Sequence, residues 1–109
     1  MSEGRKDDSE KLPMHLLPPE LLNGVASILD FGARKYAPRN WEQGMAWSRV
    51  YSAMLRHMLA WWGGEDNDPE TGKSHLWHAA CCVAFLMAYE QRGVGDDDRP
   101  EIARRQGGE

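Results

Sequence analysis

The segment from residue 65 to residue 78 gathers side chains that bind metal ions and transfer protons. Its fourteen positions hold four carboxylates and two histidines, and a third histidine, His57, precedes them. Carboxylates alone suit Mg²⁺, whereas imidazole shifts the preference toward ions such as Mn²⁺ or Co²⁺. The flanking stretches "SRVYSAMLRHMLAWW" and "AACCVAFLMAYE" have the pattern of apolar helices. The segment therefore predicts a metal site between two helices.

Two helices would have to position these side chains. We predict one helix from Ser48, as its N-cap, to about Trp62, where a glycine pair ends it. The next helix is predicted to begin after the cap residue Ser74 and to end near Tyr89 or Glu90. A short polar loop separates them, so they should be antiparallel neighbours.

One stripe of each predicted helix mixes apolar and polar residues. Spacings of three and four give the stripes Val50, Met54, His57, Trp61 and Glu65, then His75, His78, Ala79, Cys82, Leu86 and Tyr89. We expect the three histidines and Glu65 to converge, as the ligands of bundle metal sites do. A hydrogen-bonded core role stays open for His57, and Asp66 and Glu70 are expected to cap turns.

A second cluster of polar and aromatic residues lies in "FGARKYAPRNW". Lys35, Arg39 and Asn40 carry donors that suit phosphate, while Tyr36 and Trp41 offer flat faces to a base. The alternative is an ordinary exposed helix end whose cations interact with the helix dipole. The residues alone leave both interpretations open.

The whole chain is predicted to be all-α. A first helix should begin after "LLPPE" and reach about Tyr36, followed by the connecting loop "APRNWEQGMAW". No strand-like alternation or internal repeat is visible in the sequence. We expect residues 1–12 and 93–109 to be loose charged tails around one domain at 13–92.

Composition limits the classes of partner. A net charge of −4 disfavours a nucleic-acid binder, and no apolar run reaches the length of a membrane span. No signal peptide is recognisable, so a cytoplasmic protein is expected. The adjacent Cys81 and Cys82 should be buried free thiols, because neighbouring helical residues are poorly placed for a disulfide. Five tryptophans in a domain this small predict self-association, as a homodimer or homotetramer.

The motifs "FGARKY", "NW", "RHMLAWWGGEDNDPETG" and "HLWHAACC" together resemble the phage dATP/dGTP diphosphohydrolase family. This family is a branch of the MazG-like all-α nucleotide pyrophosphohydrolases, and the resemblance covers about residues 8–100. It implies a MazG-like helical bundle completed by oligomerisation. It also implies a divalent metal, Mg²⁺ or Mn²⁺ with Co²⁺ as an alternative. Some phages that replace adenine by 2-aminoadenine carry such an enzyme.

The expected metal ligands depart from the family pattern. MazG-like enzymes usually bind Mg²⁺ through a Glu-x-x-Glu pair and a Glu-x-x-Asp pair, whereas this chain has "RHMLAWWGGE" and "SHLWH" in the corresponding helices. Histidines thus stand where carboxylates are expected. We therefore assign the ligands from this sequence as His57, Glu65, Asp68, His75 and His78.

The resemblance implies hydrolysis of a purine deoxynucleoside triphosphate, dGTP or dATP, to the monophosphate and pyrophosphate. Glu65 and Asp68 would be the catalytic carboxylates, with Glu65 orienting the attacking water. The expected substrate-binding residues are Lys35, Arg39 and Arg56 for phosphate, Asn40 for phosphate or sugar, and Trp41 and Trp61 for the base. In the 2-aminoadenine context the product dGMP would feed nucleotide synthesis. The alternative is a non-catalytic helical interaction module stabilised by metal.

Overall fold

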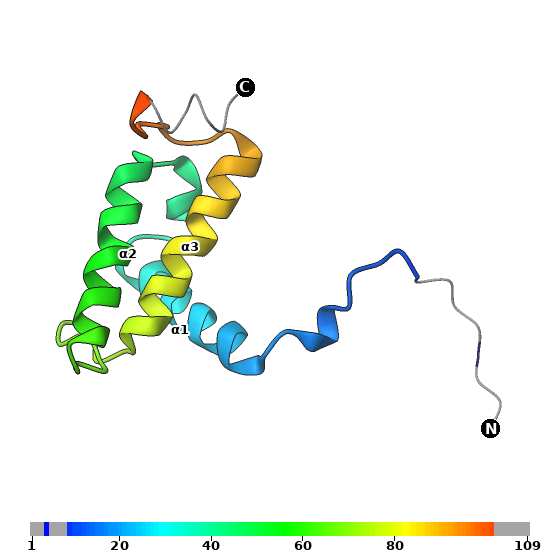
Figure 1. Cartoon of the computed structure of the whole chain (residues 1–109), viewed down its shortest axis with the longest axis horizontal. Coiled ribbons are helices and arrows are strands. Elements are labelled where there is room, and N and C mark those ends of the chain that lie inside the picture. The colour runs from blue at the N-terminus through cyan, green and yellow to red at the C-terminus, as the bar shows by residue number, and fades with distance from the viewer. Residues whose placement is uncertain (1–3, 5–8, 102–109) are drawn as a thin grey trace.

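The computed structural model describes residue 4 and residues 9–101 (Figure 1). Its elements are the 3-10 helix η1 (Met14–Leu16), α1 (Pro19–Lys35), the 3-10 helix η2 (Asn40–Gln43), α2 (Trp47–Trp62) and α3 (His75–Arg92). The described residues form no strand, which confirms the all-α prediction. None of the helices in this part of the chain is long and apolar enough to cross a membrane.

The predicted start of α3 after Ser74 is confirmed, whereas α1 begins at Pro19, within "LLPPE" rather than after it, and α3 extends to Arg92, two residues past Glu90. α1 carries Pro19 in its first turn, where a missing N–H costs nothing. α3 is capped by Ser74, whose Oγ accepts a hydrogen bond from the Leu76 N–H at 3.1 Å. It ends at Gly93, whose φ of 66° is the left-handed conformation that favours glycine.

The predicted N-cap of α2 is wrong. α2 begins one residue before Ser48, with Ala46 in the cap position. The Ser48 N–H donates to Asp98 Oδ1 at 2.9 Å, and the Trp47 N–H donates to the Asp96 carbonyl at 2.9 Å. The free donors of the first turn are therefore satisfied by a segment fifty residues away in sequence, which local signals could not reveal.

Residues 94–99 form a clasp across the start of α2. Trp47 Nε1 donates to the Val94 carbonyl at 2.9 Å, and the Arg99 guanidinium lies 5.0 Å from the Trp47 ring centre. Gly95 is required here, because a Cβ at this position would lie 2.4 Å from the Met45 carbonyl oxygen. These residues belong to the predicted C-terminal tail, which is thus bound to the bundle as far as the clasp extends. The remainder of both predicted tails lies largely outside the described residues.

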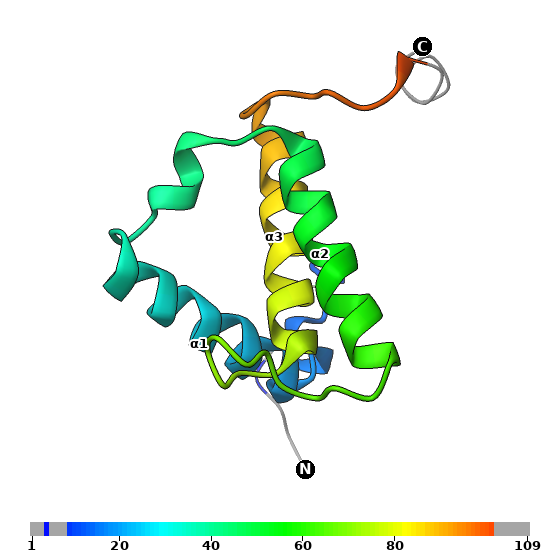
Figure 2. The same ribbon diagram turned by 90° about the vertical axis from the view of Figure 1, so that its left-hand side faces the viewer.

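α3 is the central helix of the bundle. It runs antiparallel to α2 on one side and packs against α1 on the other (Figures 1 and 2). Gly24 allows α1 to approach closely, since a Cβ there would lie 2.6 Å from Cδ1 of Trp77. The fully buried core is small and consists of Val50, Ala79, Cys81 and Tyr89 together with His75.

The two cysteines are free, as predicted. Cys81 is buried and Cys82 is half-buried on α3. Burial raises the pKa of the Cys81 thiol to about 12 and also raises the pKa of Cys82. A thiol with so high a pKa holds almost no thiolate near neutral pH and is a packing residue.

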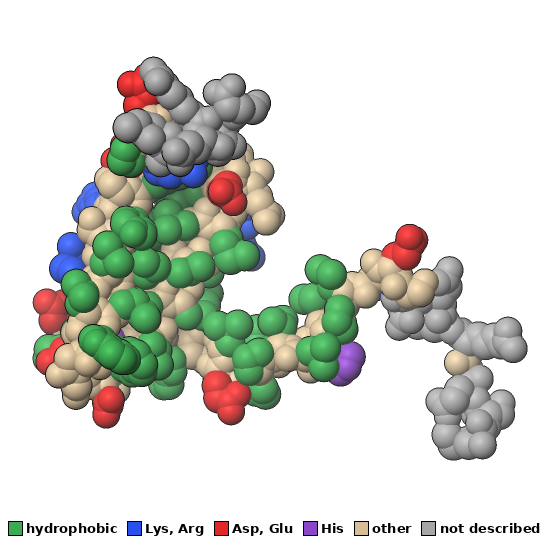
Figure 3. Space-filling model, viewed as in Figure 1, with side chains coloured by type: hydrophobic (Ala, Val, Ile, Leu, Met, Phe, Trp, Pro, Cys, Tyr) green, Lys and Arg blue, Asp and Glu red, His purple; other side chains and the backbone are tan. Residues whose placement is uncertain are grey.

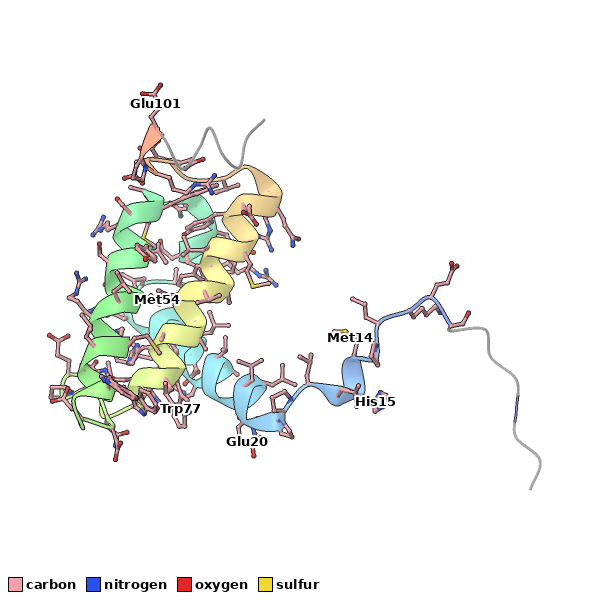
Figure 4. All side chains as sticks on the ribbon, viewed as in Figure 1. Met14, His15, Glu20, Met54, Trp77 and Glu101 are labelled. Carbon is pink, nitrogen blue, oxygen red and sulfur yellow. The ribbon has the colours of Figure 1, made fainter. Side chains whose placement is uncertain are left out.

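Residues 9–18 lead away from the bundle as an N-terminal arm (Figure 1). Met14 and His15 stand far from the three helices (Figure 4). Leu12, Met14 and Leu16 expose 79%, 65% and 70% of their surface, so the arm contributes nothing to the core.

Candidate functional site

The three histidines and Glu65 converge as predicted. Nδ1 of His57 lies 2.9 Å from Nδ1 of His75, and Nε2 of His75 lies 2.6 Å from Oε1 of Glu65. The His57 and His78 rings are stacked, with centres 4.4 Å apart and planes 4° from parallel. α2 supplies His57 and α3 supplies the other two histidines, while Glu65 follows the end of α2.

The hydrogen bonds fix which nitrogens carry protons when these histidines are neutral. The ionised carboxylate of Glu65 only accepts, so His75 Nε2 must donate and its Nδ1 must accept from His57 Nδ1. His57 then keeps an unprotonated Nε2. Within the part of the chain that is described, this nitrogen has no hydrogen-bond partner. His57 thus combines a packing role with one free lone pair.

His78 is held by a residue that the sequence analysis did not single out. The Thr71 hydroxyl donates to Asp68 Oδ2 at 3.1 Å, so the 2.8 Å contact between Thr71 Oγ1 and His78 Nε2 must have histidine as donor. Asp68 Oδ2 also lies 3.6 Å from His78 Nε2. The neutral His78 therefore keeps its lone pair on Nδ1. This hydroxyl has no recognisable spacing signal in the sequence, because its position depends on the fold of the loop.

The environment of the cluster favours neutral imidazole. Burial is the main cause that lowers the pKa of His57 and of His78. The charge of His75 lowers both pKa values further, and that of His57 also lowers the pKa of His78. Asp68 acts in the opposite direction on both. Two stacked rings would repel each other if both were cations, so a neutral pair is the consistent state.

The second predicted cluster lines a cavity of about 660 Å³. α1, the following loop and α3 form its wall, which includes the predicted residues Lys35, Arg39, Asn40 and Trp41 as well as Tyr36. His78 also lines it, so the histidine cluster and the cavity meet at this side chain. The volume lies within the usual range for a small-molecule site.

Arg39 combines a functional position with an unusual backbone. Its φ of 63° is the only positive value among the non-glycine residues described. Its guanidinium lies 3.2 Å from Glu42 and is largely exposed at the edge of the cavity. A long side chain in the left-handed region is costly and occurs more often at functional sites.

Trp41 is already packed against the protein. Its ring is stacked on Phe85 at 4.5 Å and 13°, and the Arg92 guanidinium lies 5.6 Å from the ring centre. Its carbonyl accepts a hydrogen bond from Tyr89 at 2.6 Å. Tyr36, by contrast, is 66% exposed in the cavity wall. Phe85 was not anticipated, since an aromatic residue in an apolar helix carries no functional signal.

Two other predicted substrate-binding residues lie apart from the cavity. Arg56 and Trp61 are on α2, and neither contributes to the cavity wall. Trp61 packs beside Trp62, with ring centres 6.1 Å apart. The loop before α3 is joined to α1 by Lys73, whose Nζ donates to Ser27 Oγ at 2.8 Å.

Four of the predicted metal ligands lie in close pairs, His75 with Glu65 and His78 with Asp68. Among the described residues no three His, Cys, Asp or Glu side chains are placed to hold one ion. Such pairs are compatible with Mg²⁺, which usually takes one or two protein carboxylates and completes its shell with water and substrate phosphates. A closed structural site would need four protein ligands.

The chain matches, over residues 1–99, the model of a family described as dATP/dGTP diphosphohydrolase, N-terminal. It belongs to the dATP/dGTP diphosphohydrolase family. A protein named dATP/dGTP diphosphohydrolase from Salmonella phage PMBT28 is 36% identical over 96 residues, which make up 88% of this chain. The chain spans about a third of the length of that curated relative, of which the match covers 33%. No solved structure matches the chain.

Proposed function

We propose that this chain hydrolyses the purine deoxynucleoside triphosphates dGTP and dATP to the monophosphate and pyrophosphate. The observation that carries the proposal is the junction at His78, where a neutral histidine cluster adjoins a cavity with cationic edges. Membership of the dATP/dGTP diphosphohydrolase family supports the substrate class. Cationic side chains are needed to bind the substrate phosphates, and hydrolysis needs a group that accepts a proton from water.

The proposed substrate lies in the cavity with its phosphates toward Lys35 and Arg39. Asn40 would donate to a phosphate or sugar oxygen. Because the ring of Trp41 is stacked on Phe85, we propose the exposed Tyr36 as the face that contacts the base. Trp41 would then support the cavity wall through its stack and its bond to Tyr89.

The proposed proton acceptor is His78. Its Nδ1 carries the lone pair, and Thr71 and Asp68 hold the ring in that protonation state. Burial lowers its pKa, so the neutral base form dominates at physiological pH. Glu65 orients His75, which in turn accepts from His57.

We propose a divalent ion, Mg²⁺ or Mn²⁺, as the cofactor. The carboxylate of Asp68 or that of Glu65 would hold it together with the substrate phosphates, and the free Nε2 of His57 would favour Mn²⁺ or Co²⁺. When bound, the ion neutralises phosphate charge and makes water more acidic. His75 is the least available ligand, because both of its nitrogens are in hydrogen bonds.

In a phage that uses 2-aminoadenine, the proposed product dGMP would be the precursor for that nucleotide. This role rests on the family resemblance and on the phage origin of the relative. Activity on dGTP is the minimum that it requires.

The reaction is tested by incubating the full chain with each deoxynucleoside triphosphate and Mg²⁺ or Mn²⁺, with products separated by ion exchange. We expect pyrophosphate and the monophosphate from dGTP or dATP. Inorganic phosphate, triphosphate or no turnover would contradict the proposal.

A matched pair of arginine variants tests the cavity. Arg39→Ala should lower kcat/KM by at least about tenfold, since bonds to charged groups contribute ~1.5–3 kcal/mol. Arg49→Ala removes an exposed arginine of α2 that does not line the cavity. This control should keep nearly full activity.

A further inference from the structure

Glu42 lies between two arginines beside the cavity. Arg39 Nη1 lies 3.2 Å from Oε1 and 3.3 Å from Oε2 of Glu42, and Arg92 Nη1 lies 2.8 Å from the same Oε1. Arg39 lines the cavity, whereas neither Glu42 nor Arg92 does. The carboxylate is therefore shared by one cation that lines the proposed phosphate site and one that lies outside it.

The pairing of Arg39 with Glu42 follows from local backbone geometry. Arg39 is the N-cap of η2, and its carbonyl accepts a hydrogen bond from the Glu42 N–H at 3.0 Å. Side chains three positions apart eclipse one another in a 3-10 turn, so the carboxylate comes to lie against the guanidinium. By itself this contact would offset the positive charge with which Arg39 attracts a phosphate.

A stripe of α3 brings the second arginine to the carboxylate. Phe85, Tyr89 and Arg92 recur at spacings of four and three, which place them on one face of the helix. Phe85 stacks on the Trp41 ring, and Tyr89 donates to the Trp41 carbonyl. The Arg92 guanidinium lies 5.6 Å from the same ring centre. Arg92 is the last residue of α3, and Figure 3 shows charged side chains of both signs near this end of the bundle.

The two guanidiniums and the one carboxylate leave a net charge of +1. Arg92 makes the shorter contact with Glu42, and its hydrogen bond is the largest cause that lowers the pKa of that carboxyl, ahead of the bond from Arg39. Glu42 is therefore paired mainly with Arg92. The largely exposed Arg39 then keeps most of its charge for an anionic ligand.

We propose that Arg92 is a positioning residue that acts through Glu42: it neutralises the carboxylate and so leaves Arg39 available to the triphosphate of the substrate. This inference rests on the proposed function, in which Arg39 binds phosphate. Without Arg92, the carboxylate of Glu42 competes with the phosphates for the Arg39 guanidinium. Loss of the Arg92 charge should therefore weaken phosphate binding, and loss of the Glu42 charge should not.

Charge-removing variants separate this effect from packing. Arg92→Gln keeps a hydrogen-bond donor but not the charge, and it should raise KM for dGTP several-fold while changing kcat less. Adding Glu42→Gln to the same chain should return KM close to the wild-type value, because no carboxylate is left to compete for Arg39. Glu42→Gln alone should leave KM equal to that of the wild type or lower it.

Arg49→Gln is the control, because it removes the same charge from an exposed position of α2 outside the cavity wall. Its KM should equal that of the wild type. An unchanged KM in Arg92→Gln, or an equal rise in the control, would overturn the proposal. A double variant as defective as Arg92→Gln would also overturn it, since Arg92 would then act only by packing on Trp41.

Calorimetric titration with inorganic triphosphate tests the inference without turnover. The wild type should bind triphosphate several-fold more tightly than Arg92→Gln, and the difference should shrink as NaCl is added, because exposed charges are screened. If the wild type binds in this way but hydrolyses no deoxynucleoside triphosphate, the proposed reaction is wrong and this inference stands. Equal affinity of the two chains, or no binding by the wild type, would overturn the inference itself.

Discussion

The histidines of the cluster differ in what remains available on each ring. His75 has both nitrogens in hydrogen bonds, whereas His57 and His78 each keep one lone pair in the neutral form. The sequence could predict that the three would meet, because spacings of three and four determine a helix face. It could not predict the division of roles, which depends on the Thr71 hydroxyl and on the geometry of the loop.

Thr71 should matter more than its position in a loop suggests. Thr71→Val keeps the shape but removes the hydroxyl that joins Asp68 to His78. Loss of such a supporting group typically costs about 10–100-fold in metal affinity or activity. Steady-state kinetics and metal titration should show this loss, and Thr71→Ser should restore most of it. Equal defects in both variants would indicate a purely steric role.

Acid should destabilise the folded chain through the cluster. Burial lowers the pKa of His57 and His78 below the usual 6.5, so the unfolded chain binds protons more readily. Stability from these groups is complete above about pH 6.5 and is lost as pH falls through their folded pKa values. Urea unfolding of the metal-free protein between pH 5 and 8 measures this slope. Replacing both histidines by Gln should flatten it.

Helix ends could be predicted where a local sequence signal determines them, but not where a distant segment does. Ser74 and Gly93 are local signals that gave the start and the cap of α3 correctly, and the proline pair gave the start of α1 to within two residues. Ser48 looked like an equally good cap, yet its N–H and side chain bind Asp98 of the clasp. Capping by a distant segment leaves no local trace, which is also why the clasp itself was expected to be a loose tail.

Two glycines of α1 should respond oppositely to the same substitution. Gly24→Ala places a Cβ 2.6 Å from Trp77 and should lower the free energy of unfolding by ~1–3 kcal/mol. Gly32→Ala meets nothing within 4 Å and should raise it by ~0.5–1 kcal/mol through helix propensity. Thermal and urea melts compare the two. A stabilising Gly24→Ala would mean that α1 does not pack on Trp77 in solution.

At the scale of the whole molecule, the two faces of the bundle differ in kind. The side that includes α1 carries the cavity, its cations and the polar cluster, whereas the opposite side carries an apolar groove with Glu90, Asp98 and Arg99 in its wall. Five tryptophans predict association from the sequence; in the structure Trp62 is 81% exposed on α2 and Trp47 lines the groove. Which aromatic residues are left exposed depends on the packing of all three helices.

Self-association should make thermal stability depend on protein concentration. Because only folded chains can dimerise, raising the protein concentration from ~1 to ~100 μM should increase Tm by several degrees. Met58→Glu places a charge on an exposed apolar side chain of α2, and its Tm should stay constant over the same range if this side of α2 is the interface. Differential scanning fluorimetry or circular dichroism at several concentrations provides the measurement.

The clasp also has a consequence for how the chain opens. By joining Met45 and Trp47 to Asp96, it closes a loop that contains all of α2 and α3, while α1 stays outside that loop. Opening of α2 or α3 must therefore break the clasp, but α1 can detach from α3 alone. Native-state hydrogen exchange should show amides of α1 exchanging at lower free energy than those of α2 and α3, which should open together as one cooperative unit. Gly95→Ala disrupts the clasp and should lower the free energy of exchange of the α2 amides toward that of the α1 amides.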